Sequence, residues 1–156
     1  MTTREIHTHY KPVVHVPAQA ITTTNTPSTG VDLKGYEAAE FLINIGTVTN
    51  IANSPQPTWS LKLQHSDTSN ANFEDVTDST MVATGSAASP VSAPDSSTGV
   101  FLTIDAASED AAVYSVGYVG PKRYARVVNT AANTPGSTPY AVTALLHRPS
   151  LTPTSH

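Results

Sequence analysis

The chain has no cysteine among its 156 residues, so disulfide bridges and thiolate metal sites are excluded. Charged residues are also scarce, at 13% of the chain against the usual ~25% of globular domains. The formal net charge is −4, and no run of Lys or Arg offsets it. Proteins that bind duplex DNA usually present a basic face. We therefore expect no nucleic-acid partner.

Long apolar segments are missing as well. No hydrophobic run approaches the ~20 residues that a membrane-spanning helix needs. The chain starts with the polar sequence Met1-Thr-Thr-Arg-Glu, and no apolar segment typical of a signal peptide follows it. These features favour a soluble protein released into a cytoplasm, without a membrane partner.

Alternating apolar residues predict β-strands. Trp59, Leu61 and Leu63 alternate with polar residues, and Phe41, Ile43 and Ile45 share one parity in a second segment. Further strands are expected at 100–105, 113–118, 123–129 and 140–147. Several short strands separated by Gly, Pro and Asn indicate an all-β, antiparallel, jelly-roll-like sandwich. We expect the two apolar triplets to form walls of its core, opposite or beside each other.

The N-terminal segment is expected to behave differently from the rest. The β-forming residues between Glu5 and Val16 are interrupted by Pro12 and closed by Pro17, which favours an edge strand or an extended strap. We predict an extended arm over 1–35, a sandwich domain over 36–149 and a tail over 150–156. The arm is expected to add to the sheet edge of a neighbouring subunit. Its candidate interface residues are Ile6, Tyr10, Val13 and Val14.

A second group of candidate interface residues lies in segment 113–128. Tyr118 and Tyr124 combine an apolar ring with a polar tip, which suits contacts between sheets or subunits. Arg123 and Arg126 suit bidentate pairing, either with loops of the same chain or with a partner's carboxylates.

Candidate catalytic and ligand-binding residues have simpler interpretations. His7 and His9 would face one side of a strand, with His15 or His147 as further metal ligands, but the spacing provides no complete set. The carboxylates and serines form no catalytic signature. We therefore expect no metal, no cofactor and no enzymatic activity. A sugar-stacking platform is the alternative use of the aromatic residues Trp59, Tyr114, Tyr118, Tyr124 and Tyr140.

Two stretches together point to a family. Trp59–Val76 (WSLKLQHSDTSNANFEDV) and Val113–Val128 (VYSVGYVGPKRYARVV), followed by a strand that ends at His147-Arg148-Pro149, resemble small β-sandwich virion proteins of tailed bacteriophages and gene-transfer agents. Members of that group are described as head decoration, cement or spike-base proteins.

The resemblance implies a structural role. The protein would be made in the host bacterial cytoplasm and would sit on the capsid surface as a homo-oligomer, typically a trimer, bound to the major capsid protein. It implies no catalytic residues. Two alternatives remain: a spike or fibre base at capsid vertices, and a carbohydrate-binding sandwich that attaches to a cell surface.

Overall fold

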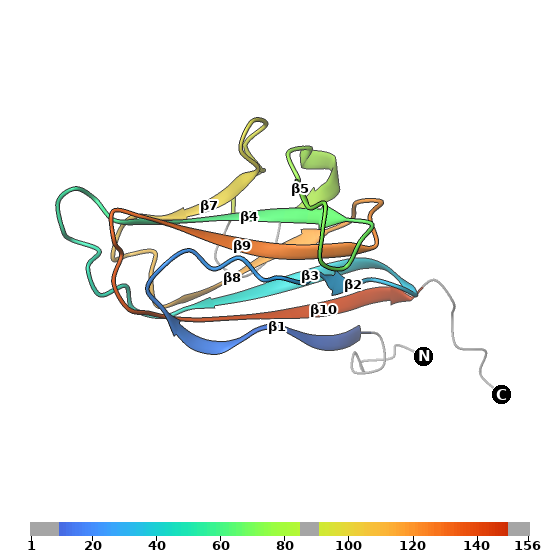
Figure 1. Ribbon diagram of the computed structural model, residues 1–156, viewed down its shortest axis with the longest axis horizontal. Coiled ribbons are helices and arrows are strands. Elements are labelled where there is room, and N and C mark those ends of the chain that lie inside the picture. Colours follow the sequence, from blue (N-terminus) through green and yellow to red (C-terminus); the bar gives the residue numbers. More distant parts are fainter. Residues whose placement is uncertain (1–9, 85–90, 150–156) are drawn as a thin grey trace, which may run out of the picture.

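The computed structural model describes residues 10–84 and 91–149, and these fold into two antiparallel sheets packed face to face (Figure 1). No helix within these residues is long and apolar enough to span a membrane. The elements, in chain order, are β1 (Tyr10–Ile21), β2 (Val31–Asp32), β3 (Tyr36–Ile45), β4 (Thr58–Ser66), β5 (Glu74–Asp75), the 3-10 turn η1 (Ser79–Met81), β6 (Val82–Ala83), β7 (Val100–Ile104), β8 (Ala112–Tyr118), β9 (Tyr124–Ala132) and β10 (Thr138–Pro149).

The strand order confirms the predicted architecture. Sheet A has the order β1-β10-β3-β8-β6, and sheet B has the order β2-β9-β4-β5 with β7 also paired to β4. The antiparallel pairs β1–β10, β2–β9, β3–β8 and β4–β7 are nested in sequence, with successive pairs in alternate sheets. A ribbon of nested pairs rolled into two sheets is a jelly roll.

The two predicted apolar triplets meet between the sheets. Trp59, Leu61 and Leu63 lie on β4 of sheet B, and Phe41, Ile43 and Ile45 lie on β3 of sheet A. All six side chains are at most 1% exposed and belong to one buried cluster. The triplets therefore form opposite walls of the core, as the alternation predicted.

The separate arm predicted over residues 1–35 is wrong for residues 10–35. β1 pairs along β10 of the same chain, with Val13 opposite Ala144, and its Val16 is buried in the core. Val31 and Leu33, which follow in the connection to β3, are buried too. The prolines exclude only a central position, because an edge strand is paired on one side and tolerates missing N–H groups.

Candidate interaction surface

The outer face of sheet A is almost free of charge. In the paired strands, residues that alternate with the buried ones point away from the core. Val14 is 68% exposed and Val113 is 46% exposed on this face. We call it the A face, and define it by Pro12, Val14, Glu40, Leu42, Asn44, Val113, Ser115, Gly117, Ala141, Thr143 and Leu145. Within this set only Glu40 carries a charge.

Glu40 lies toward one side of the A face. It is opposite Gly117 on β8, and a Cβ built at Gly117 would lie 3.0 Å from its Oε2 atom and 2.9 Å from Cβ of Ala83 on β6. The carboxylate therefore sits against the β8–β6 side of the sheet, away from the exposed Val14 on β1. The part of the face formed by β1 and β10 contains no charged member of the set.

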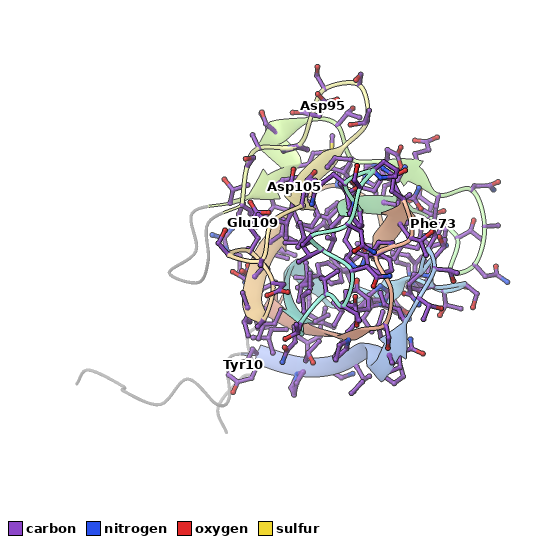
Figure 2. All side chains as sticks on the ribbon, turned by 90° about the vertical axis from the view of Figure 1, so that its left-hand side faces the viewer. Tyr10, Phe73, Asp95, Asp105 and Glu109 are labelled. Carbon is purple, nitrogen blue, oxygen red and sulfur yellow. The ribbon has the colours of Figure 1, made fainter. Side chains whose placement is uncertain are left out.

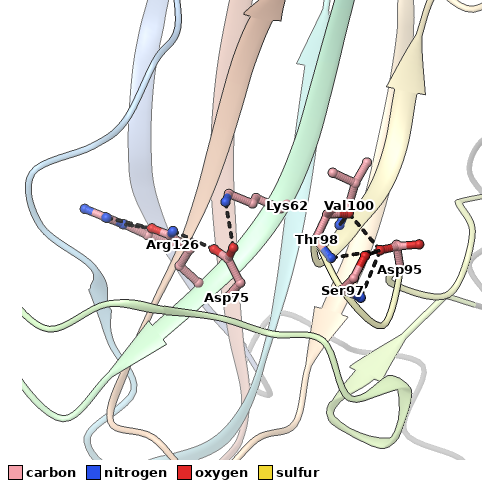
Figure 3. A network of polar contacts seen from close by, with 8 residues as sticks. Lys62, Asp75, Asp95, Ser97, Thr98, Val100 and Arg126 are labelled. Atoms are coloured by element: carbon pink, nitrogen blue, oxygen red, sulfur yellow. Dashed lines mark hydrogen bonds and ion pairs between the residues drawn. The ribbon is translucent and has the colours of Figure 1, made fainter.

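The outer face of sheet B has the opposite character. Lys62 Nζ lies 2.7 Å from Asp75 Oδ2, and Gln64 Nε2 donates a hydrogen bond of 2.7 Å to Asp75 Oδ1 (Figure 3). Arg126 donates from Nε and from a terminal nitrogen to Gln64 Oε1, at 2.9 and 2.6 Å. Its guanidinium lies 3.8 Å from the ring centre of Phe73. This face is a connected polar network whose charges are paired within the chain.

The ionisation of Asp75 follows from that network. Partial burial opposes the charged form, but hydrogen bonds from Lys62 and Gln64 and the nearby charge of Arg126 outweigh it. The pKa of Asp75 therefore lies below its ordinary value. The carboxylate is charged at neutral pH and holds the network together.

The edge of sheet A at β1 is protected against strand addition. Pro12 and Pro17 have no N–H group, and the register of β1 against β10 shifts on both sides of Val16. Prolines and bulges are the usual devices that keep an edge strand from pairing with another chain. β1 pairs with β10 along one edge, and the prolines and register shifts disfavour the predicted addition of residues 10–21 to a neighbour's sheet, which stays a prediction.

The four predicted interface residues of the arm have different positions. Ile6 lies outside the described residues. Tyr10 is half-buried opposite His147, and Val13 packs against the core. Val14 alone presents a largely exposed apolar side chain, on the A face.

Tyr118 is not at the surface. Its side chain is fully buried, and its hydroxyl oxygen lies 2.9 Å from His65 Nδ1 and accepts a hydrogen bond of 3.1 Å from the Lys122 N–H. Burial raises the pKa of Tyr118 to about 12. This residue therefore links β8, β4 and the following turn inside the chain, and the prediction that it contacts a partner is wrong.

The predicted arginine pairing is formed within the chain. Arg123 donates from Nε and a terminal nitrogen to the two carboxylate oxygens of Asp32, at 2.9 and 2.8 Å, and lies 5.0 Å from the ring centre of Tyr124. The pKa of Asp32 is lowered mainly by this hydrogen bonding. Arg126 is occupied by Gln64, as described above. Arg123 therefore makes a bidentate pair with a carboxylate of its own chain, and Arg126 donates twice to one amide oxygen; contact of either arginine with a partner stays a prediction.

The aromatic platform is not assembled. Trp59, Tyr114, Tyr118 and Tyr140 are each at most 5% exposed. Tyr124 is half-buried next to Arg123. The five residues proposed for sugar stacking therefore provide no shared surface on which a sugar ring would lie.

The carboxylates of Asp95 and Glu109, in the loops on either side of β7, accept hydrogen bonds from nearby backbone N–H groups. Asp95 Oδ1 accepts hydrogen bonds from the N–H groups and hydroxyls of Ser97 and Thr98, and these lower the pKa of Asp95 (Figure 3). Glu109 and Asp105 lie close together in Figure 2. Glu109 Oε2 accepts a hydrogen bond of 2.9 Å from the Asp105 N–H. These contacts close turns, as Asx-type chemistry does.

The histidines proposed as metal ligands fall into two groups. His7 and His9 lie outside the described residues. His15 Nε2 accepts a hydrogen bond of 3.1 Å from the Val127 N–H and is not free to bind a metal. Among residues 10–84 and 91–149, no three His, Asp or Glu side chains gather into a metal-binding group.

Comparison with known proteins identifies no family. No family model and no curated protein matches this chain. A solved structure of the CBM22-1 and GH10 modules of xylanase 10B from Clostridium thermocellum, complexed with xylohexaose, is similar at 10% identity and a TM-score of 0.39. The match covers 94% of this chain and 23% of that one. A likeness of this size carries no information about function.

Proposed function

We propose that this protein is a non-enzymatic structural component of a virion, which decorates and stabilises the capsid of a tailed bacteriophage. The observation that carries the proposal is the contrast between the two outer faces of the sandwich. Sheet B has a charged, internally paired surface suited to water, whereas the A face is nearly uncharged and exposes Val14 and Val113. Val14 and Val113 lie on β1 and β8, and the half-buried side chains of Leu145 and Leu42 lie on the two strands between them. Apolar side chains that extend across one face mark a protein contact surface.

The fold and the sequence resemblance support the same role. Jelly rolls are common in viral capsid domains, although lectins share them, so the fold contributes by analogy only. The stretches that resemble phage head proteins form β4 with its following loop and β5, and β8 with β9, which are consecutive strands in different sheets. In this proposal the protein's partners are the major capsid protein and further copies of itself, and the A face packs against one of these two partners on the shell.

Binding only to assembled capsid would stabilise the capsid by mass action. The test is co-sedimentation of the purified protein with capsids assembled without it, together with the melting temperature of those capsids. Saturable binding and a raised melting temperature are expected. Binding that is absent at micromolar protein would contradict the proposal.

Two variants make the test specific to a surface. Val14→Asp places a charge on the A face at an exposed position, and Thr130→Asp places the same charge on an exposed residue of β9 in sheet B. We expect Val14→Asp to bind at least about tenfold more weakly, because its charge would lose hydration in the contact. A tenfold loss corresponds to ~1.4 kcal/mol of binding free energy. Thr130→Asp is expected to bind like the unaltered chain. Equal binding by all three proteins would exclude the A face as the contact surface.

A further inference from the structure

The A face has the size of a weak interface. Ser115 and Gly117 on β8 are buried within the chain, so the open part of the face is formed mainly by β1, β10 and β3. With strands ~4.8 Å apart and about eight paired residues at ~3.3 Å each, the plan area of these three strands is roughly 380 Å², and two such faces in contact would remove roughly 800 Å² from water. Specific interfaces start near ~1,000–1,200 Å² in total, and smaller ones are weak or transient. The A face therefore has enough area for one weakly bound protein partner.

The charge pattern selects the kind of partner. A charged partner surface would lose hydration against the A face without gaining an opposite charge, which is unfavourable. The outer face of sheet B, with Lys62, Asp75 and Arg126, is such a surface. An uncharged partner is required, and a second A face meets this requirement.

We propose that two copies of this chain pack through their A faces around a two-fold axis, an inference that rests on the proposed function and names the partner of the same surface. The small side chain of Ala141 on β10 allows two sheets to approach to the ~10 Å of face-to-face packing. Leu42, Leu145 and Val14 fill the space between them. A patch that contacts itself generates two-fold symmetry.

Glu40 does not prevent this arrangement. If the axis lies between the two sheets and crosses the strands at right angles at the Leu42–Thr143 pair, Glu40 lies two residues along β3 from it. The two Glu40 side chains are then separated by about 13 Å, from the ~3.3 Å rise per residue. That separation exceeds the Debye length of ~10 Å at 0.1 M salt, so their repulsion is largely screened.

The first measurement is sedimentation equilibrium of the full chain in the absence of capsids. A concentration-dependent dimer is expected, and the modest area predicts that it dissociates on dilution. Val14→Asp should weaken dimerisation at least about tenfold, and Thr130→Asp should leave it unchanged. A chain that stays monomeric up to millimolar concentration would overturn the inference. So would a trimer, because a face that contacts itself cannot build three-fold symmetry.

The second measurement locates the contact. The chain has no cysteine, so a single spin label can be attached at Asn44→Cys, an exposed position toward the end of β3 on the A face, or at Thr130→Cys on the outer face of sheet B. Four sheets stacked at ~10 Å put the labels within roughly 20 Å of each other at residue 44, and at least about 30 Å apart at residue 130. The reverse order of distances would mean that another surface forms the dimer.

The outcomes for this inference and for the proposed function are distinguishable. A dimer with the expected distances that does not bind capsids refutes the virion role and leaves the two-fold contact standing. A monomer whose capsid binding is reduced by Val14→Asp refutes the two-fold contact and leaves the virion role standing, because the A face would then contact the capsid protein itself.

Discussion

His15 on β1 accepts a hydrogen bond from the backbone N–H of Val127 on β9, so a side chain of sheet A is hydrogen-bonded to the backbone of sheet B. The two nitrogens are 3.1 Å apart. The imidazole also packs edge-on against Phe41, with ring centres 5.7 Å apart. One residue thus satisfies a donor on β9 and fills the space between the sheets at the β1 edge.

This contact makes folding sensitive to acid. Burial, together with the charge of Arg126, lowers the pKa of His15 from 6.5 to about 4. The neutral ring is the form that accepts the hydrogen bond. Between pH 6.5 and 4 the unfolded chain binds a proton at His15 and the folded chain does not, so the free energy of unfolding falls as the pH drops through this window.

His15→Gln tests this prediction, since glutamine retains an acceptor but does not titrate. The contribution of His15 is fully present above pH 6.5 and lost by pH 4, and it amounts to roughly 2–3 kcal/mol at ~1.36 kcal/mol per pKa unit, reduced for partial exposure. Urea unfolding at pH 7 and pH 4 measures it. Between pH 7 and pH 4, the free energy of unfolding of the variant should fall by about 2–3 kcal/mol less than that of the original chain. Equal losses would show that His15 titrates normally.

The central core should be sensitive to truncation. Leu61→Ala and Leu63→Ala each remove a side chain that is at most 1% exposed, and each should cost ~2–5 kcal/mol through lost burial and a residual cavity. Thr130→Ala on the exposed side of β9 is the control, with an expected change within ~0.5 kcal/mol. Thermal or urea unfolding gives all three values. Unchanged stability in both leucine variants would contradict the packing of β4.

The strands that could be predicted are those with strict alternation. Trp59, Leu61 and Leu63 repeat with period two, and burial on one face explains the pattern. β1 was less accessible to this reasoning, because its register shifts near Val16 interrupt the period and its prolines are typical of loops as well as of edges. Only the position of β10 decides between these options, and a single sequence does not reveal which strand pairs with β10.

The A face was partly predictable. Val14 was proposed as an interface residue from its β propensity, but the uncharged character of the face depends on which residues four non-consecutive strands place side by side. The burial of Tyr118 had a local signal, because Tyr114, Val116 and Tyr118 share one parity in β8 and all point inward. Its link to His65 requires the pairing of distant segments and has no sequence signature.

The buried hydroxyl of Tyr118 should stabilise the fold. This oxygen accepts from the Lys122 N–H, and we predict that its own hydrogen is donated to His65 Nδ1, which requires a neutral His65 with its proton on Nε2. Tyr118→Phe leaves both partners unpaired and should cost ~1–3 kcal/mol. NMR of the His65 ring nitrogens reports the tautomer.

Tyr124→Phe is the matched control, since Tyr124 is half-buried beside Arg123. Its expected effect is within ~0.5 kcal/mol. If both variants were equally stable, or if the His65 ring in the unaltered chain had its proton on Nδ1, the hydrogen-bond assignment at Tyr118 would be wrong.

Deletion of β1 should unfold the sandwich. Residues 10–21 provide one side of the β10 pairing and bury Val16 and Ile21, so a chain that begins at residue 22 exposes the β10 edge and part of the core. A chain that lacks only residues 2–9 retains every described contact of β1 and should melt cooperatively, near the temperature of the full chain. Circular dichroism melting of both truncated proteins separates the two expectations. A cooperative transition in the shorter chain, close to that of the longer one, would show that β1 is the detachable arm that its prolines first suggested.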